Sequence, residues 1–371
     1  MPVTEKTVRT GLAGVYADTT AISMISQETG SLTYRGYPVQ ELAGQCTFEE
    51  VVYLLWHGEL PTGVQLDAQN RAERAQRSLD PITAAILTGL PITAHPMDTL
   101  RTAISLLGAS DPLENDSSPA AIRAKALRLY AVVPAIVATD QRRRHGFGAV
   151  PPRDDLGYAA NFLYMTFGEV PAPAVVAAFE TSLILYAEHG FNASTFTARI
   201  VTSTLSDLYS AVTAAIGALK GPLHGGANEA VMPMLEQIAI PDNAGPWLEG
   251  ALADGRKIMG FGHRVYASGD PRVPVMRAAL GPIAGRRDGE LLIGVYEALA
   301  SAVYEAKGLH PNLDYPAGLA YHLIGFDTPT CTPIFVTARI AGWTAHIAEQ
   351  VTANALIRPL AVYDGPAERM P

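Results

Sequence analysis

The chain has 371 residues, of which 48% are hydrophobic and 17% charged, and its formal net charge is −9. This length favours one large domain or two domains over a single small core, and the acidic balance argues against nucleic acid as a partner. No run of about 18 uncharged apolar residues occurs and the first residues lack the apolar core of a signal peptide, so we expect no membrane partner and a cytoplasmic location.

The cysteines indicate the redox environment of the protein. The two cysteines, Cys46 and Cys331, are far apart and outside any metal-ligand spacing. This favours a reduced compartment with buried thiols and predicts no metal site. If the substrate is anionic, an acidic chain must create a local positive field, so arginines near the candidate site are of interest.

The first predicted elements are a small sheet and a capped helix. Residues 11–39 contain short β-prone runs separated by glycine and polar residues, which predicts a small N-terminal sheet. Thr47 with Glu50 three residues later fits a capping box. We therefore expect a buried helix through residues 51–56, closed by Gly58 and Pro61.

From there to about residue 220 the pattern predicts one helix after another. The helix over residues 173–188 ends at His189, where local spacing alone favours a structural contact with the last carbonyls. The helix over residues 206–220 is stopped by Gly221 and Pro222. Further helices are expected at residues 228–240, 247–256, within 276–307 and from about 333 onward.

Three side chains stand out for chemistry. Two histidines lie among glycines, in Gly-Pro-Leu-His224-Gly-Gly-Ala-Asn and Gly-Phe-Gly-His263-Arg-Val-Tyr, where a backbone without Cβ atoms can approach a ligand. A lone carboxylate, Asp314, follows in Pro-Asn-Leu-Asp314-Tyr-Pro-Ala-Gly, beside helix-breaking residues. The helix expected after His224 would direct its first N–H groups at the histidine and favour a neutral imidazole. We predict that the three form one acid/base site.

Proton abstraction next to a carbonyl group needs a base, a hydrogen-bond donor for the enolate oxygen and an acid for the second reactant. One aspartate and two histidines can fill these roles, while arginines can bind carboxylates bidentately. A metal-dependent hydrolase that uses His224, His263 and Asp314 is a different reading, but no pair with metal-ligand spacing supports it. A catalytically inactive binding protein is a further alternative.

Several motifs, in order along the whole chain, resemble the citrate synthase family. They are the two histidine segments, the Asp-Pro-Arg272 and Pro-Asn-Leu-Asp314 segments, and Ala-Arg339-Ile-Ala-Gly-Trp-Thr-Ala-His. Upstream lies Tyr-Ala-Glu-His189-Gly-Phe-Asn-Ala-Ser-Thr-Phe, and Arg358-Pro-Leu-Ala-Val-Tyr-Asp-Gly follows near the end.

The resemblance implies a Claisen condensation of an acyl-CoA thioester with oxaloacetate, followed by thioester hydrolysis and release of CoA. It implies that Asp314 is the base, that neutral His224 stabilises the enolate, and that His263 binds the ketone and acts as acid. It assigns oxaloacetate binding to His189, Arg272, Arg339 and Arg358, which revises the structural interpretation of His189. It suggests acyl-CoA contacts at Lys257, Gly260, Gly262, Val265 and Phe335. No bound cofactor is implied, because the acyl-CoA is a substrate.

The run Asp-Tyr-Pro-Ala-Gly from Asp314 departs from the pattern of many members, which continue with an aromatic pair and serine. Pro316 and Ala317 are therefore expected to alter the acyl pocket. The run looks more like members that accept propionyl-CoA and make 2-methylcitrate, often alongside citrate. A strictly acetyl-CoA-specific citrate synthase is the alternative.

The resemblance also implies an architecture. We expect a mainly α-helical, two-domain fold with a small N-terminal β element. The large domain would comprise residues 1–223 and 326–371, and the small domain, residues 224–325, would hold both catalytic histidines and the aspartate. A homodimer is expected, with Arg358 reaching the active site of the second subunit.

Overall fold

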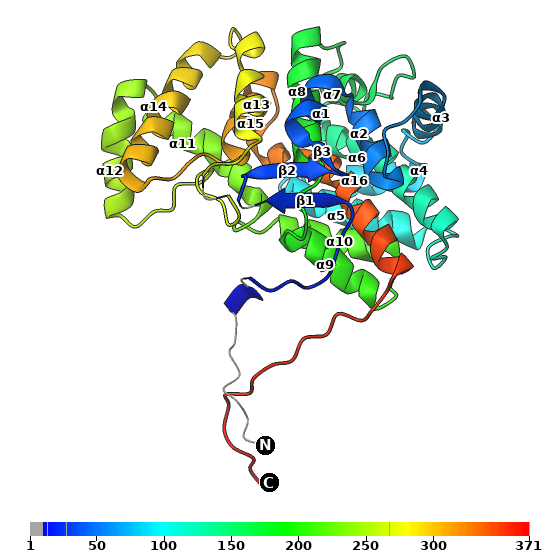
Figure 1. The fold of residues 1–371 in the computed structure, drawn as a ribbon. Helices are drawn as coiled ribbons and strands as arrows, with labels where there is room; N and C mark the ends of the chain where they lie inside the picture. Colours follow the sequence, from blue (N-terminus) through cyan, green and yellow to red (C-terminus); the bar gives the residue numbers. More distant parts are fainter. Residues whose placement is uncertain (1–9, 13, 27, 267, 371) are drawn as a thin grey trace.

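The computed structural model describes residues 10–12, 14–26, 28–266 and 268–370. These residues form sixteen α-helices, five short 3₁₀-helices and one three-stranded sheet (Figure 1). The predicted mainly α-helical fold with a small N-terminal β element is confirmed. None of the helices in this part of the chain is both long and apolar enough to cross a membrane.

The sheet is antiparallel, and its strands follow one another in sequence order. They are β1 (Ser23–Ser26), β2 (Ser31–Tyr34) and β3 (Tyr37–Pro38). Leu32 and Tyr34 of β2 are fully buried, and the Tyr34 hydroxyl donates to the Glu188 carbonyl at 2.9 Å. The sheet therefore supports the chain segment that carries His189.

The β-structure predicted for the first part of residues 11–39 is wrong. Residues 10–12 form the short turn η1 (Thr10–Leu12), and the segment from there to the sheet is irregular. Gly11, Leu12 and Gly14 have φ angles of 64°, 57° and 70°, a left-handed conformation that a strand does not contain. Ala13 and Gln27, which fall in the predicted β region, lie outside the described residues.

The capping-box prediction is confirmed. In α2 (Phe48–His57) the Thr47 hydroxyl accepts the Glu50 N–H at 3.3 Å, and the Glu50 carboxylate accepts the Thr47 N–H at 2.7 Å. Gly58, with φ of 92°, ends the helix in the left-handed conformation that glycine adopts without strain. Before it lies α1 (Val39–Gln45).

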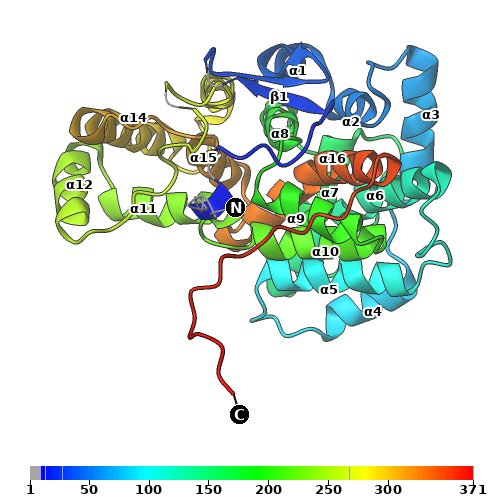
Figure 2. The same cartoon turned by 60° about the horizontal axis from the view of Figure 1, so that its bottom comes forward.

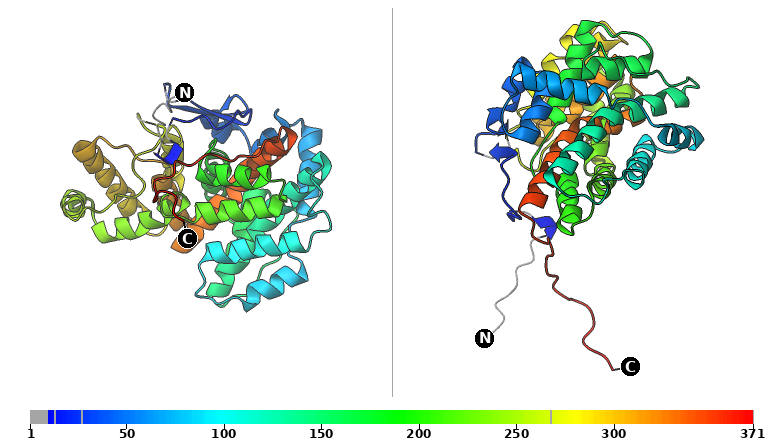
Figure 3. Two further views of the ribbon diagram at one scale, coloured as in Figure 1. Left: turned by 90° about the horizontal axis from the view of Figure 1, so that it is seen from below. Right: turned by 90° about the vertical axis from the view of Figure 1, so that its right-hand side faces the viewer.

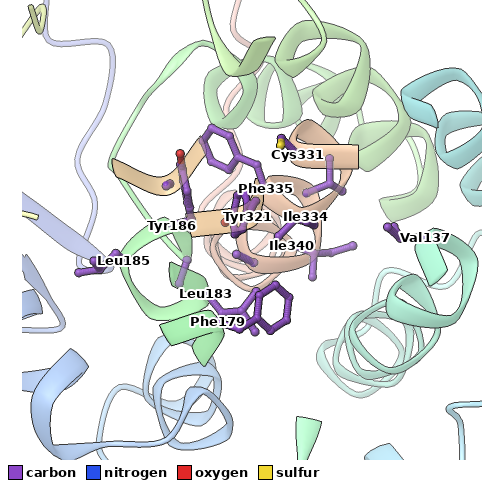
Figure 4. Packing of buried hydrophobic residues seen from close by; sticks show 14 of the residues in the cluster. Val137, Phe179, Leu183, Leu185, Tyr186, Tyr321, Cys331, Ile334, Phe335 and Ile340 are labelled. Atoms are coloured by element: carbon purple, nitrogen blue, oxygen red, sulfur yellow. The ribbon is translucent and has the colours of Figure 1, made fainter. Parts of the chain in front are cut away.

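The long helix α16 (Cys331–Thr352) runs through the centre of the molecule. It packs against α2, α5, α6, α8, α9 and α10, and nearly all of its side chains are buried on every face. Figure 4 shows the packing of buried side chains around it, with Phe335 beside Tyr186. The surrounding helices are α3 (Gly63–Arg74), α4 (Pro81–Gly89), α5 (Pro96–Ala109), α6 (Pro119–Arg144), α7 (Tyr158–Phe167), α8 (Pro173–Tyr186), α9 (Ala193–Ser203) and α10 (Leu208–Leu219).

A second set of elements lies at one side of this assembly (Figure 2). It comprises η2 (Gly225–Ala230), α11 (Val231–Ile238), η3 (Pro241–Asn243), α12 (Ala244–Ala253), α13 (Val273–Ala278), η4 (Gly281–Ile283), α14 (Gly289–Lys307) and α15 (Asp314–Ile324). Helix α15 packs against α11 and also against α8 of the first set. The short η5 (Thr328–Thr330) leads into α16. The division at residues 223/224 and 325/326 remains a prediction.

Two predicted boundaries in this second set are wrong. The helix expected over residues 228–240 begins as the 3₁₀-helix η2 and becomes α-helical only at Val231. Asp314, expected in a loop, is the first residue of α15, and Pro316 lies in the same first turn. Proline is tolerated there because the N–H groups of the first turn have no partner within the helix.

After α16 the chain continues as an extended segment, residues 353–370, with its side chains largely exposed. Figures 1 and 3 show this segment leaving the helical body. The apolar side chains of Leu360 and Tyr363 are 87% and 77% exposed, so they gain nothing from packing within their own chain.

Candidate active site

One large cavity collects most of the predicted site residues. Its volume is about 1060 Å³, and its lining comes from the N-terminal segment, the α8–α9 link, the His224 and His263 segments, α15 and α16. The predicted residues that line it are His189, His224, Gly262, His263, Val265, Arg272, Asp314, Phe335 and Arg339. Lys257, Gly260 and Arg358 are not among the lining residues.

The geometry around His224 fixes its tautomer. The Ser194 backbone N–H donates to His224 Nε2 at 3.2 Å, and because this N–H can only donate, Nε2 carries no proton. Nδ1 therefore carries the proton of the neutral ring. Burial, and then the positive charge of Arg339, lower the pKa of His224 to about 4. A helix start does face the histidine as expected, but it is that of α9, where Ser194 is the second residue.

His263 is held in the opposite tautomer. Its Nδ1 accepts the backbone N–H groups of Val265 at 3.0 Å and Tyr266 at 3.3 Å, so Nε2 carries the proton. Burial, and then Arg272, lower the pKa of His263 to about 4. The ring of His189 lies edge-on to that of His263, with centroids 5.1 Å apart.

His189 belongs to the cavity rather than to the end of α8 alone. Its Nε2 lies 3.1 Å from the Tyr266 hydroxyl, and burial, followed by Arg272, holds the pKa of His189 well below its ordinary value. The interpretation of His189 as a structural contact with the last helix carbonyls is therefore incomplete, because its side chain also lines the cavity.

Asp314 has the electrostatics of a base. Burial raises the pKa of its carboxyl group to about 6, although the Tyr186 hydroxyl donates to Oδ1 at 2.6 Å and stabilises the ionised form. At neutral pH the group is ionised, and it holds a proton more firmly than an ordinary aspartate does. The Tyr186 ring lies 4.1 Å from that of Phe335 between centroids, which fixes the hydroxyl beside the carboxylate.

Two buried arginines supply the positive field, and they differ in how their charge is balanced. Asp270 accepts two bonds from the Arg272 guanidinium, from Nε at 2.9 Å and Nη2 at 2.7 Å. Asp270 also accepts the Leu313 N–H at 3.1 Å, which ties this ion pair to the residue before Asp314. Although burial opposes its charge, the Asp270 carboxylate holds the pKa of Arg272 above its ordinary value.

Arg339 has no such ion pair with any residue that the structure describes. Its Nε donates to the Tyr186 carbonyl at 2.7 Å and its guanidinium lies over the Phe335 ring, 4.7 Å from the centroid. Burial lowers the pKa of Arg339 to about 10, and Nη1 has no hydrogen-bond partner in the described part of the chain. Because Arg339 lines the cavity, its guanidinium charge fits an anionic ligand there.

The glycines of the His263 segment shape the backbone. Gly260 and Gly262 have φ angles of 83° and 74°. The Gly262 N–H donates to the His310 carbonyl at 2.8 Å, and the Asn312 N–H donates to the Gly260 carbonyl at 2.9 Å. These bonds join the His263 segment to the chain just before Asp314. Gly260 has a clear structural role, and Lys257 is exposed away from the cavity.

The structure does not bring Arg358 to the cavity of its own chain. Arg358 is exposed in the extended segment after α16. Pro316 and Ala317 are buried inside the protein and do not line the cavity, so their effect on the acyl pocket stays a prediction. Asp314 contacts the Tyr186 hydroxyl, and the Phe335 ring lies beside that of Tyr186.

Three functional partners were not assigned from the sequence. Tyr186 holds Asp314, Asp270 holds Arg272, and Ser194 fixes the tautomer of His224. Each lies inside one of the motifs that resemble the citrate synthase family, so the motifs indicated the segments that contain these residues. Their contacts join separate segments of the chain, which spacing along one segment cannot reveal.

The arrangement suits carbon–carbon bond formation next to a carbonyl group. It offers a carboxylate base, two neutral imidazoles that each present one N–H, and two guanidinium groups in one cavity. Among the described residues no group of three or more His, Cys, Asp and Glu side chains is placed to hold a metal ion, so the metal-hydrolase reading finds no support here.

Comparison with known proteins agrees with this geometry. The chain is 60% identical over 363 residues to a 2-methylcitrate synthase of Mycobacterium tuberculosis, covering 98% of this chain and 92% of that one. It is 59% identical over 362 residues to a citrate synthase of Mycolicibacterium smegmatis, covering 98% and 96% of the two chains.

Solved structures agree as well. Citrate synthase of Thermoplasma acidophilum, in a ternary complex with carboxymethyl coenzyme A and oxaloacetate, superposes with a TM-score of 0.93 at 32% identity, covering 99% of this chain and 98% of that one. Citrate synthase of Thermotoga maritima gives 0.89 at 39% identity, with 98% of each chain covered. The family model for the citrate synthase C-terminal domain matches residues 11–360. The chain therefore belongs to the citrate synthase family.

Proposed function

We propose that this chain is an enzyme that condenses oxaloacetate with a short acyl-CoA and then hydrolyses the thioester, releasing CoA. Acetyl-CoA would give citrate and propionyl-CoA would give 2-methylcitrate. The observation that carries the proposal is the placement of the Asp314 carboxylate in one cavity with the N–H groups of His224 and His263. The names of the relatives, both 2-methylcitrate synthase and citrate synthase, support it.

In the first step the Asp314 carboxylate removes a proton from the carbon next to the thioester carbonyl. The enolate oxygen that forms accepts a hydrogen bond from His224 Nδ1–H. A neutral imidazole suits this role, and burial with the nearby Arg339 keeps the pKa of His224 near 4. Such a donor contributes about 3 to 4 kcal/mol of transition-state stabilisation.

In the second step the enolate carbon attacks the ketone carbon of oxaloacetate, and the ketone oxygen takes a proton from His263 Nε2. This leaves negative charge on the imidazole ring. The two backbone N–H groups that donate to Nδ1, from Val265 and Tyr266, lie in position to stabilise that charge. Water then adds to the thioester carbonyl, and the CoA thiol leaves.

Binding of oxaloacetate rests on its two carboxylates. We assign one to Arg339, which lines the cavity, and the other to Arg272 with His189 nearby. We further propose a homodimer in which Arg358 of each subunit completes the cavity of the other. The exposed, extended segment that carries Arg358 supports this arrangement.

The experiment measures kcat/KM for acetyl-CoA and propionyl-CoA at saturating oxaloacetate, following release of the CoA thiol. A methylene group changes binding in an apolar pocket by only about 1 to 3 kcal/mol, so we expect both thioesters to be used. A preference for acetyl-CoA beyond about 200-fold would exceed that range and favour the strictly acetyl-CoA-specific alternative.

The control variant is Asp314→Asn, which keeps the size of the side chain and an acceptor for the Tyr186 hydroxyl but removes the base. We expect CoA release to fall by about 10² to 10⁴ with either thioester while oxaloacetate still binds. Unchanged turnover in this variant would refute the assignment of Asp314 as the base.

A further inference from the structure

The positive charge of Arg339 is buried without a direct ion pair among the described residues. Arg339 is 1% exposed, its Nε donates to a carbonyl oxygen, and its Nη1 has no hydrogen-bond partner within the described ranges. Arg272, by contrast, is bonded directly to Asp270. A buried cation is costly unless a negative charge offsets it, so the fold must supply one near Arg339.

That charge lies on Glu188, in the link between α8 and α9. Glu188 is fully buried, and its carboxylate rests against α16 at Gly342. A Cβ atom at position 342 would collide with Glu188 Oε2 and with the Ala187 carbonyl oxygen. Gly342 follows Arg339 by three residues, so the glycine opens a space for the carboxylate on the face of α16 that carries Arg339.

The two oxygens of Glu188 have different surroundings. Oε1 accepts from the Ser23 hydroxyl at 2.9 Å and lies 2.9 Å from His346 Nε2. Arg199 Nη1 donates to His346 Nδ1 at 3.1 Å, so a neutral His346 carries its proton on Nε2 and donates to Glu188. Oε2 has no hydrogen-bond partner among the residues described.

The carboxylate is ionised although it is buried. Burial opposes its charge, but His346, Arg339 and Ser23 together hold the pKa of Glu188 below its ordinary value. Glu188 is also the main group that opposes the effect of burial on Arg339. The two charges therefore offset each other electrostatically, without a hydrogen bond between them.

We propose that Glu188 is the internal counter-ion of Arg339, held by His346 and Ser23 so that it balances the guanidinium charge without a hydrogen bond to it and leaves the guanidinium able to bind a substrate carboxylate. Glu188 is a positioning residue, since it acts only through Arg339. The inference rests on the proposed function, because it takes oxaloacetate as the anion. Its consequence is that Glu188 and the substrate compete electrostatically for the same cation.

The test is Glu188→Gln, which removes the charge and keeps the shape. Removing the charge of Glu188 leaves the attraction of Arg339 for an anion unopposed, so oxaloacetate should bind at least about tenfold more tightly to this variant. Without oxaloacetate, the variant should melt at a lower temperature than the original protein. Added oxaloacetate should raise the melting temperature of the variant by more than it raises that of the original protein. Calorimetric titration and thermal melts with oxaloacetate alone measure both.

Two further variants make the result decisive. Glu349→Gln removes a carboxylate from the outer end of the same network, where Glu349 accepts from Arg199 at 2.7 Å, and should not tighten oxaloacetate binding. The double variant Glu188→Gln with Arg339→Gln removes both charges and should recover the melting temperature lost in the single variant. If the single variant fails to fold, a folded double variant supports the inference, and a double variant that also fails to fold overturns it.

The outcomes separate this inference from the proposed function. If the original protein binds no oxaloacetate, the proposed function fails. If it binds oxaloacetate and the folded Glu188→Gln variant binds equally or more weakly, only the counter-ion role fails, because a residue needed merely for structure would weaken binding.

Discussion

The proton positions in the active site follow from which N–H groups face each histidine. Backbone N–H groups donate to Nε2 of His224 and to Nδ1 of His263, so the two rings present opposite nitrogens as donors. Burial lowers the pKa of both rings to about 4, whereas it raises that of Asp314 to about 6. Above pH 6 the cavity therefore holds an ionised base together with two neutral donors, as enolate chemistry requires.

Tyr186→Phe should shift the pH dependence of the reaction. The hydroxyl stabilises the ionised carboxylate of Asp314, so its removal should raise the pKa of that group by about one unit. Activity is lost as pH falls through this pKa, because the base becomes protonated. The acid limb of kcat/KM should then move from near pH 6 to near pH 7, and an acid limb that stays in place would contradict the role of Tyr186.

For single residues, the sequence predicted which ones line the cavity better than it predicted their contacts. The residues assigned by motif, His224, His263 and Asp314, all line one cavity. The neutral state of His224 was expected from a following helix, but the N–H that faces it comes from α9, about thirty residues upstream. Burial, the main cause of each pKa shift, exists only once the chain has folded.

Among the elements, the tight link before η2 positions His224 most directly. Gly225 lies against the preceding helix α10, where an added Cβ atom would come within 2.6 Å of Leu219 Cγ and 2.7 Å of its carbonyl oxygen. The glycine beside His224 therefore serves the packing of the chain itself, whereas the sequence suggested close approach to a ligand. Gly226 has more room, with its nearest contact at 3.5 Å.

Gly225→Ala and Gly226→Ala form a matched pair for this element. We expect the first to destabilise the protein by about 1 to 3 kcal/mol and to lower kcat, because the link must shift and carry His224 with it. The second should leave both nearly unchanged. Denaturant unfolding and steady-state kinetics measure the two effects, and equal behaviour of the pair would show that the contact with Leu219 does not position His224.

The sequence predicted the presence of helices better than it predicted where they begin and end. The capping box of α2 is a local signal, and its two bonds occur as predicted. The start of α15 at Asp314 was missed because Pro316 reads as a helix breaker, although a proline in the first turn breaks no helix bond. The irregular segment before the sheet was read as β-structure, because the positive φ angles of its glycines are not visible in composition.

At the scale of the whole molecule, the extended segment after α16 exposes apolar side chains. Its side chains, including Leu356 and Leu360, are 64% and 87% exposed, and Arg358 between them is exposed as well. A second copy of the chain would cover this apolar surface and receive the arginine. The family resemblance suggested this arrangement, since nothing in one chain's periodicity identifies residues that act in another.

Mixing two impaired proteins tests the shared site. Arg358→Ala should bind oxaloacetate poorly, since it loses a charged contact to a carboxylate, and Asp314→Asn should lack the base. In a mixed dimer the Asp314→Asn subunit supplies an intact Arg358 to the cavity of its partner, which has an intact Asp314. Random reassembly makes about half of the dimers mixed, each with one complete cavity of two, so about a quarter of the original activity should return. The dimer fraction is measured by sedimentation, and mixed dimers that form without gaining activity would show that each chain completes its own cavity.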